Sequence, residues 1–354
     1  MKIACLFADR AFDKMGQDML FDGMFAGLVN AFGSTNVRHF PDGHPQFLGH
    51  EDYLQEWPFW LGAGCLRGKP LATFPLDEAD AILVNVRWIL NAVEDGIDLD
   101  VYNDLSDCID PNKVILIDSS DTPSYQRLLT CKAILGGHIP LFAHRPGIVN
   151  DSPLTHGDVQ WALGRRLATV HISVPYQHVM RMMAKWLPDP YEVVLDRNVT
   201  CALNDNGVYR RAIVEAISDQ FTQSRIMWGS ASKYFIDGTM PLLSPPAYYH
   251  QIQNSRVVVA ARGAGVDCLR ETEICCLGSL LVTQDPGWGY GLFTGVHCLM
   301  YETPETCVAQ CHWAIDNPGK AREIAREGQR LYFEQASPER QVYRLLEKAG
   351  LLCH

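Results

Sequence analysis

The sequence lacks the features that mark membrane-spanning, secreted or generally nucleic-acid-binding proteins. No apolar run approaches the ~20 residues that cross a bilayer, and the amino terminus shows no basic segment followed by an apolar one. No block of five or more like charges occurs, and the net charge is −11. Such a surface repels nucleic acid and anionic lipid as a whole, so a basic binding surface would have to be local.

The sequence also lacks a disulfide or zinc framework. Its 12 cysteines include no Cys-x-x-Cys pair, and Cys275 and Cys276 stand in an apolar run where a thiol packs as a small hydrophobe. Cys307, Cys311 and His312 have partial zinc-ligand spacing, but zinc needs four ligands and no second pair stands nearby. We therefore expect buried thiols and a cytoplasmic location.

Two cofactor signatures are missing as well. No Asp-x-Asp follows a predicted strand where a metal-dependent transferase would carry one, and Asp98-Leu-Asp100 follows an acidic loop segment and reads as a surface turn. The glycines near residue 265 do not form a dinucleotide fingerprint, because Cys268 replaces glycine at the sixth position. We expect no bound metal ion.

Apolar periodicity is what the sequence does contain. A length of 354 residues with 47% hydrophobic residues suggests two packed domains, and short apolar runs alternate with helical patterns, which favours doubly wound parallel sheets. The predicted strands are 2–8, 36–40, 81–86, 114–117, 139–144, 167–174, 191–195, 225–228, 255–261 and 279–283. The main predicted helices are 15–32, 207–221, 245–253, 267–277, 305–316, 318–333 and 337–348. This pattern alone fits glycosyltransferases, epimerases, dehydrogenases and solute-binding proteins equally well.

The segment 255–285 narrows the choice. A buried strand leads into a turn with Arg262, Gly263 and Gly265, and the next helix carries Arg270 and Glu273 three residues apart on one face. Bare amides at such a turn bind anions, and a cation for a diphosphate beside a carboxylate for a ribose diol suits a nucleotide-sugar donor. The alternative is a common glycine turn followed by an exposed ion pair.

The stretch 245–340 resembles the carboxyl-terminal domain of GT-B-fold glycosyltransferases, in particular the bacterial and phage group that includes CgeB-like proteins and has a family 1/4-type domain. A weaker similarity covers 18–41 and 115–121. The matching positions of the stronger stretch are Tyr249, Ser255, Gly263, Gly265, Arg270, Glu273, Leu277, Gly278, 295–301, 304–317, 321–328 and Arg340.

The resemblance implies a donor site. Glu273 matches the carboxylate expected to hold the ribose hydroxyls of the donor, whereas Gly265 stands eight residues earlier, where many retaining relatives carry a second glutamate. This departure leaves the donor sugar and the stereochemistry open. The other residues that the resemblance places at the donor are Arg210, Arg211, Arg262, Gly263 and Arg270.

The general base of a transferase is expected at the strand ends of the first domain, since those ends line the ligand edge of a parallel sheet. Asp118 and Asp121 follow the strand 114–117, and His144 ends the strand 139–144. Asp9 and Asp13 are alternatives after the first strand. Asp118 and Asp121 could instead cap the following turn.

The resulting expectation is an α/β protein with two Rossmann-like doubly wound domains in the GT-B arrangement and a cleft between them. We expect 1–185 on the acceptor side, 186–330 as the donor domain, and 331–354 as a helix that packs back on the first domain. The expected activity is glycosyl transfer from a nucleotide sugar, a UDP-sugar first, to a glycan, a small molecule or a modified DNA base. The alternatives are a nucleotide-sugar epimerase and a non-catalytic nucleotide- or sugar-binding protein.

Overall fold

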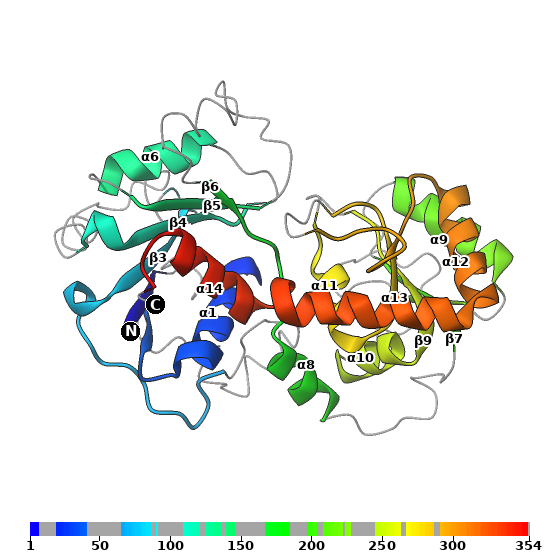
Figure 1. Ribbon diagram of the computed structural model, residues 1–354, viewed down its shortest axis with the longest axis horizontal. Helices are drawn as coiled ribbons and strands as arrows, with labels where there is room; N and C mark the ends of the chain where they lie inside the picture. Colours follow the sequence, from blue (N-terminus) through cyan, green and yellow to red (C-terminus); the bar gives the residue numbers. More distant parts are fainter. Residues whose placement is uncertain are drawn as a thin grey trace. The chain divides into compact units, whose positions relative to one another are not determined.

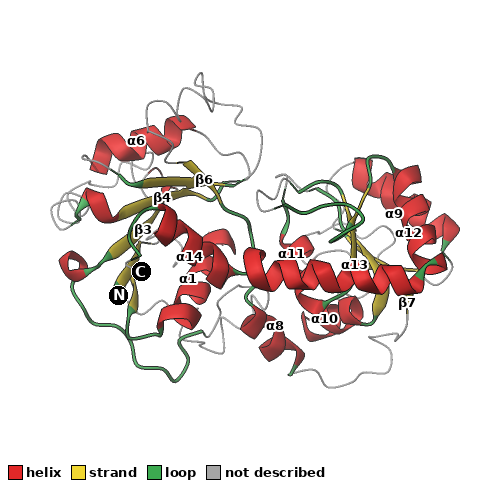
Figure 2. Cartoon of the chain, viewed as in Figure 1, coloured by secondary structure: helices red, strands yellow, loops and turns green. Residues whose placement is uncertain are grey.

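The computed structural model describes residues 1–6, 19–40, 65–86, 90, 109–120, 125–135, 139–145, 167–184, 197–203, 208–221, 224–227, 245–262, 267–286 and 291–352. The chain divides into two compact units, each of which is treated by itself. Unit 1 comprises Met1–Pro175 and Pro338–His354, and unit 2 comprises Tyr176–Ser337. Figures 1 and 2 show that each unit contains a sheet with helices around it.

Within the described residues, the sheet of unit 1 has six parallel strands in the order β2-β1-β3-β4-β5-β6. The inner strands are short apolar runs whose side chains are all buried, because helices cover both faces of the sheet. The strands are β1 (Ile3–Leu6), β2 (Val37–Phe40), β3 (Ala81–Asn85), β4 (Val114–Asp118), β5 (Leu141–His144) and β6 (Leu167–Thr169).

Two helices from opposite ends of the chain pack together in unit 1. They are α1 (Met19–Phe32) and α14 (Pro338–Lys348), which lie side by side in Figure 1. Asn30 donates a hydrogen bond to Glu339 at 2.9 Å. The helices approach so closely that a Cβ on Gly27 would lie 2.7 Å from Pro338. A third helix, α6 (Tyr125–Leu135), covers the other side of the sheet.

In the described part of unit 2, the sheet has five parallel strands in the order β11-β10-β9-β7-β8. The central strand is β9, whose valines are fully buried. The strands are β7 (Arg197–Ala202), β8 (Ser224–Met227), β9 (Ser255–Val259), β10 (Leu280–Thr283) and β11 (Leu299–Met300).

Helices cover both faces of this second sheet. Two of them, α9 and α12, pack side by side on one face, and α10 and α11 cover the other (Figure 2). The described helices of unit 2 are α8 (Tyr176–Met183), α9 (Val208–Gln220), α10 (Pro245–Gln253), α11 (Leu269–Leu277), α12 (Pro304–Asp316) and α13 (Pro318–Leu331). A π-helical turn, Tyr332–Ala336, follows α13.

The units differ in extent from the expected domains. Helix α8 packs against α10, so unit 2 begins at Tyr176 rather than after residue 185. The π-helical turn contacts α11 and α13, so unit 2 continues to Ser337 and the segment returning to unit 1 begins at Pro338. The predicted strand 191–195 lies outside the described residues.

The described cysteines are free, and most are buried. Cys307 and Cys311 belong to the core under the second sheet, and the ring of His312 packs against Phe221 with centroids 4.5 Å apart. No group of three or more metal-ligating side chains occurs in the part of the chain that the structure describes. These thiols therefore act as core residues.

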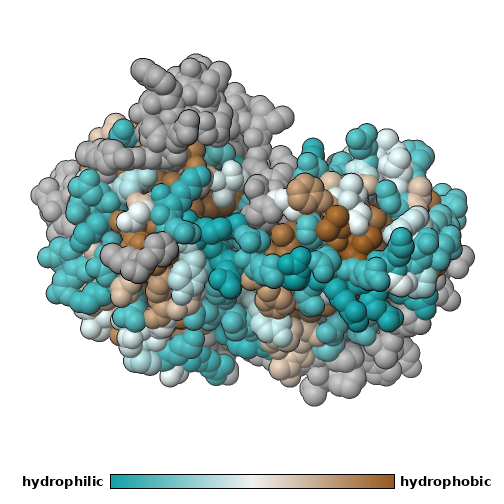
Figure 3. All heavy atoms as spheres, in the orientation of Figure 1, coloured by the Kyte–Doolittle hydropathy of each residue, from teal (hydrophilic) through white to brown (hydrophobic). Residues whose placement is uncertain are grey.

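The described surface is mostly polar in the view of Figure 3, with apolar atoms in limited patches. Within the residues described, no helix combines the length and apolar character needed to cross a membrane.

Candidate functional site

The candidate donor site lies where the chain leaves β9 in unit 2. Ala260 and Ala261 continue the buried strand, and α11 begins after Cys268. Gly263 and Gly265 fall outside the described residues. In a parallel sheet, the carboxyl ends of the strands form the edge at which ligands bind, so the side chains around this exit decide what the site can hold.

Glu273 projects from α11 and is held by two phenols. Its carboxylate Oε2 accepts a hydrogen bond from the Tyr248 hydroxyl at 2.7 Å, and Oε1 accepts one from the Tyr249 hydroxyl at 3.0 Å. The glutamate is only 3% exposed. Burial raises the pKa of Glu273, against the two hydrogen bonds and the Arg270 charge, which lower it. The carboxylate thus has a fixed orientation.

Arg270 stands one turn earlier on the same helix, and its side chain is half-buried. Burial alone would lower its pKa, but Cys268, Tyr248 and Glu273 nearby raise the pKa of Arg270 overall. The guanidinium makes no hydrogen bond or ion pair with the residues that the structure describes. A half-buried guanidinium of this kind is suited to bind a phosphate.

Arg210, on α9, fastens the backbone that leaves the sheet. Its Nε donates to the carbonyl of Arg262 at 2.7 Å, and its Nη2 donates to the carbonyl of Ala261 at 3.1 Å. The side chain is 2% exposed, and its burial, followed by the charge of Arg270, lowers the pKa of Arg210. The neighbouring Arg211 is exposed. The structure thus separates two arginines that the sequence left as equivalent candidates.

Arg262 joins the exits of two strands. Its Nη2 donates to the carbonyl of Asp285 at 2.8 Å, and its backbone N–H donates to the Gln284 side chain at 3.1 Å. Since Gln284 and Asp285 follow β10, this arginine holds the end of β10 against the end of β9.

Sequence reasoning missed a second buried carboxyl, Glu271. Its Oε2 accepts from the backbone N–H of Cys268 at 2.9 Å, and its Oε1 accepts from the Thr283 hydroxyl at 3.3 Å. The side chain is fully buried, and burial raises the pKa of Glu271 to about 7. Its spacing from Cys268 is that of a capping box, but cysteine is not a usual N-cap residue, so the sequence alone does not predict this cap.

In unit 1, the structure brings two of the predicted base candidates together. Asp118 ends β4, His144 ends β5, and the two residues are register partners. Asp118 is fully buried, and its carboxylate already has partners. It accepts a hydrogen bond from the Ser120 backbone N–H at 3.1 Å and lies 3.5 Å from Arg127 Nη2, with which it forms an ion pair. Asp121 lies outside the described residues.

His144 is placed differently from Asp118. Its Nδ1 lies 2.7 Å from the carbonyl oxygen of Arg145. A carbonyl can only accept, so Nδ1 carries the proton in this contact and Nε2 is the accepting nitrogen of the neutral ring. A histidine in this tautomer can take up a proton at Nε2.

Histidine and arginine side chains gather beside His144. His171 is 1% exposed, and its pKa is lowered to about 3 by burial and then by Arg344, Arg145 and His144. The Gln341 amide holds the backbone of His171 from both sides, accepting from its N–H at 2.8 Å and donating to its carbonyl at 3.1 Å. Helix α14 thereby reaches the carboxyl edge of the first sheet.

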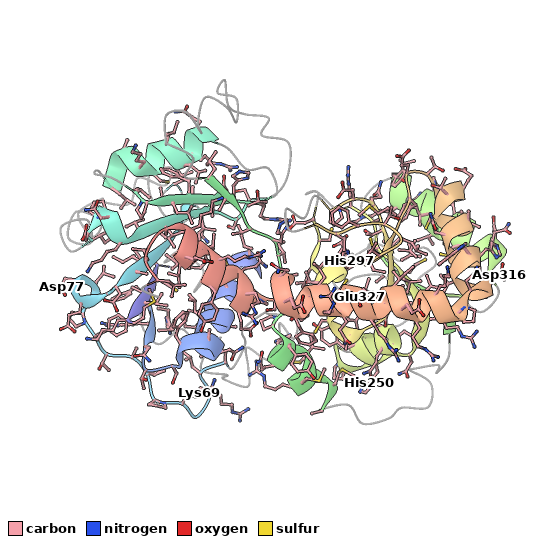
Figure 4. The ribbon with its side chains drawn as sticks, viewed as in Figure 1. Lys69, Asp77, His250, His297, Asp316 and Glu327 are labelled. Carbon is pink, nitrogen blue, oxygen red and sulfur yellow. The ribbon has the colours of Figure 1, made fainter. Side chains whose placement is uncertain are left out.

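The turn before β11 borders the second sheet. His297 Nδ1 accepts from the Phe293 N–H at 3.2 Å, and Phe293 is 62% exposed. Figure 4 shows His297 next to Glu327 of α13, and shows His250 on α10. A Cβ on Gly328 would lie 2.4 Å from the His297 carbonyl oxygen. The turn is therefore anchored on α13.

Comparison with solved structures identifies the fold. The chain is similar to HepE of Anabaena in complex with UDP-glucose, with a TM-score of 0.57 and 10% identity over 99% of this chain and 100% of that one. A glycosyltransferase from Rickettsia africae matches with a TM-score of 0.57 and 9% identity, over 99% of this chain and 97% of that one. An alpha-glucosyltransferase in complex with UDP-glucose and DNA containing an abasic site matches with a TM-score of 0.54 and 8% identity, over 99% of each chain.

The chain shares the fold of these glycosyltransferases. It is a mixed α/β fold with parallel sheets, as in GT-B enzymes, and at these identities the likeness concerns the fold alone. No protein-family model and no curated protein sequence matches the chain, so nothing in the sequence comparisons ties it to the CgeB-like group.

Proposed function

We propose that this protein is a glycosyltransferase that uses a nucleotide-activated sugar, with a UDP-sugar as the first candidate. The observation that carries the proposal is the pairing of Arg270, which lacks a hydrogen-bond partner among the described residues, with the oriented carboxylate of Glu273 at the exit of β9. The fold supports it, because HepE and the alpha-glucosyltransferase named above hold UDP-glucose.

In this proposal, unit 2 is the donor side and unit 1 the acceptor side of a two-domain GT-B enzyme. Glu273 accepts hydrogen bonds from the ribose hydroxyls, and Arg270, with the turn that contains Gly263 and Gly265, binds the diphosphate. Arg210 and Arg262 act by holding the backbone of that turn's entrance, since their donors bind main-chain carbonyls.

The proposed reaction joins an acceptor oxygen to the anomeric carbon of the donor sugar and breaks the bond from that carbon to the diphosphate. The electron pair leaves with the nucleoside diphosphate, whose added negative charge the Arg270 guanidinium offsets. Protein cations can supply this stabilisation, so we propose a metal-independent enzyme. The acceptor hydroxyl loses its proton to a base.

We propose His144 as that base in preference to Asp118. Asp118 is engaged by Arg127 and by a backbone N–H, whereas the tautomer of His144 leaves Nε2 as an accepting nitrogen. A carbohydrate or small-molecule acceptor fits the net charge of −11 better than DNA does. Arg145, a basic residue near this strand end, is 3% exposed and adds little to the surface charge.

Donor binding can be tested by thermal shift with UDP, GDP, CMP and TDP and their sugars. A ligand at about 100 times its dissociation constant adds about 2.7 kcal/mol of stability. We expect UDP or UDP-glucose to stabilise the wild type, and Glu273→Ala and Arg270→Met to lose the response. Arg256→Met, an exposed arginine on β9, is the matched control. The proposal would be contradicted if no nucleotide stabilised the wild type, or if the Glu273 variant showed the same thermal shift with nucleotide as the wild type.

Catalysis can be tested by UDP release from UDP-glucose in the presence of a panel of sugars and small hydroxylated acceptors. We expect acceptor-dependent release that His144→Asn abolishes while donor binding persists. Conversion of the donor sugar without an acceptor would instead indicate an epimerase. Binding without any turnover would indicate a non-catalytic protein, and stimulation by duplex DNA would identify a DNA acceptor.

A further inference from the structure

Two tyrosines that are consecutive in the chain occupy the two oxygens of one carboxylate. Tyr248 and Tyr249 belong to α10, which packs against α11, and each donates its hydroxyl to a different oxygen of Glu273. We infer that Tyr248 and Tyr249 are positioning residues that make Glu273 selective for a nucleotide with an intact ribose diol over a deoxyribose nucleotide. This inference rests on the proposed donor site.

The geometry suits a two-sided clamp. Successive residues of a helix point about 100° apart, so the two phenols approach the carboxylate from different directions. Their rings are 5.3 Å apart and inclined at 67°, an edge arrangement that fixes each ring against the other. Tyr249 is 1% exposed and also meets the ring of His178 edge-on, whereas Tyr248 is half-buried. The hydroxyls are therefore placed by packing.

The number of hydrogen-bond acceptor positions on Glu273 explains why a ribose diol would be preferred over a deoxyribose. An ionised carboxylate offers about four acceptor positions, two on each oxygen. The tyrosines occupy one position on each oxygen of Glu273, which leaves one position on each. Two adjacent hydroxyls of a ribose match two such positions. A deoxyribose would leave one acceptor unpaired in a buried site, and an unpaired buried polar group is what gives a binding site strong discrimination.

A purely structural role for the phenols would also be compatible with their burial. In that case, replacement by phenylalanine would lower stability and weaken every nucleotide to the same extent. A positioning role predicts a different result. Loss of one phenol frees one oxygen of Glu273, so the carboxylate can rotate, and the affinity for a nucleotide with a ribose diol falls toward the affinity for one with a single hydroxyl. The ratio of two affinities therefore separates the roles.

The experiment titrates UDP and 2′-deoxy-UDP into the full chain and into Tyr248→Phe and Tyr249→Phe. Loss of one hydrogen bond to a charged group predicts that the wild type prefers UDP by about 10- to 100-fold, and that each variant reduces this preference to about 3-fold or less. The control is Tyr301→Phe, which removes another buried phenol whose hydroxyl donates to a backbone carbonyl, that of Ala260, at 2.6 Å. It should keep the wild-type ratio.

A second readout follows from charge. Each phenol favours the ionised carboxylate, so its removal raises the pKa of Glu273 further. As the pH is lowered, Glu273 should therefore become protonated at a higher pH in the variants than in the wild type. UDP binding by the variants should weaken at that higher pH. This measurement does not depend on the deoxy nucleotide.

The outcomes separate the inference from the proposed function. If the wild type binds no nucleoside diphosphate, the donor site itself is wrong. If it binds UDP but not in preference to 2′-deoxy-UDP, the contact of Glu273 with the ribose diol is wrong, and the positioning role fails with it. If the wild type shows the preference and both variants keep it, the positioning role alone is wrong and the donor site stands. An equal change in Tyr301→Phe also overturns the role. Should Tyr249→Phe fail to fold, Tyr248→Phe decides, because the half-buried Tyr248 leaves less of the core to disturb.

Discussion

Replacing Glu271 with glutamine should remove a pH dependence from the stability of unit 2. The carboxyl is fully buried, and its two oxygens accept from the Cys268 N–H and the Thr283 hydroxyl. Burial raises its pKa from an ordinary 4.5 to about 7. The folded state therefore holds this proton more tightly than the unfolded state does.

The sign and the size follow from that displacement. Below the unfolded pKa of 4.5 both states carry the proton, so Glu271 imposes no ionisation cost there. As the pH rises through the interval from 4.5 to about 7, the unfolded state loses its proton first and the free energy of unfolding falls. Above about 7 the full cost applies, and the displacement corresponds to about 3 kcal/mol.

Glu271→Gln cannot ionise, so this fall should disappear. The amide keeps one acceptor oxygen, and loss of the second hydrogen bond lowers stability at every pH by about 1 kcal/mol. The diagnostic is therefore the slope: relative to the wild type, the variant should gain about 3 kcal/mol between about pH 5 and about pH 8.

Urea unfolding at a series of pH values across this range gives the free energy of unfolding at each pH, and so its change with pH. Glu323→Gln is the control, because it makes the same chemical change on an exposed side chain of α13. Two results would refute a buried carboxyl that titrates near neutrality. In one, the free energy of unfolding of Glu271→Gln depends on pH as that of the wild type does. In the other, the control variant shows the same altered pH dependence as Glu271→Gln.

Three further changes test the packing around the sites. Gly328→Ala should lower the free energy of unfolding by about 1–3 kcal/mol, measured by thermal melting, because its Cβ would lie 2.4 Å from the His297 carbonyl; a wild-type melting temperature would show that α13 yields. Gln341→Ala should cost about 2 kcal/mol, since both hydrogen bonds to the His171 backbone are lost, and hydrogen exchange at that N–H should quicken; unchanged protection would mean that α14 is held by other contacts. Arg210→Met should destabilise the chain by about 2 kcal/mol and weaken UDP binding, because two carbonyls after β9 lose their donor; full affinity in calorimetry would contradict its role in holding the turn.

The sequence predicts the elements best where apolar runs have clear limits. The expected strand 255–261 is observed as Ser255–Val259, and the expected helix 337–348 as Pro338–Lys348. The helix is well predicted because proline at its start and Gly350, with a φ of 72°, at its end mark both limits. These proline and glycine signals are local, so they predict the ends of a helix without knowledge of the elements against which the helix packs.

Other elements depend on contacts that a sequence does not contain. Helix α8 was not predicted, because eight residues without a strong N-cap gain their stability from packing on α10. Strand β7, Arg197–Ala202, was not among the predicted strands, and the expected strand 191–195 lies outside the described residues.

The sites divide in the same way. Arg270 and Glu273 share a helix, so their spacing alone predicts that they lie on one face. The contact of Glu273 with Tyr248 and Tyr249 depends on the docking of α10 on α11, and the pairing of Asp118 with His144 depends on the order of β4 and β5. No periodicity in the chain encodes these two arrangements.

The return of α14 to unit 1 bears on how the protein is made. Synthesis proceeds from the amino terminus, so the first 175 residues leave the ribosome long before Pro338–His354, which completes their unit. Unit 2 is a single continuous segment, Tyr176–Ser337, and all of it is available before α14 is synthesised. Helix α14, which packs on α1, thus emerges after all of unit 2, and the later-encoded unit can complete its fold first. A chain cut before Pro338 would leave unit 2 whole and unit 1 without a helix of its core.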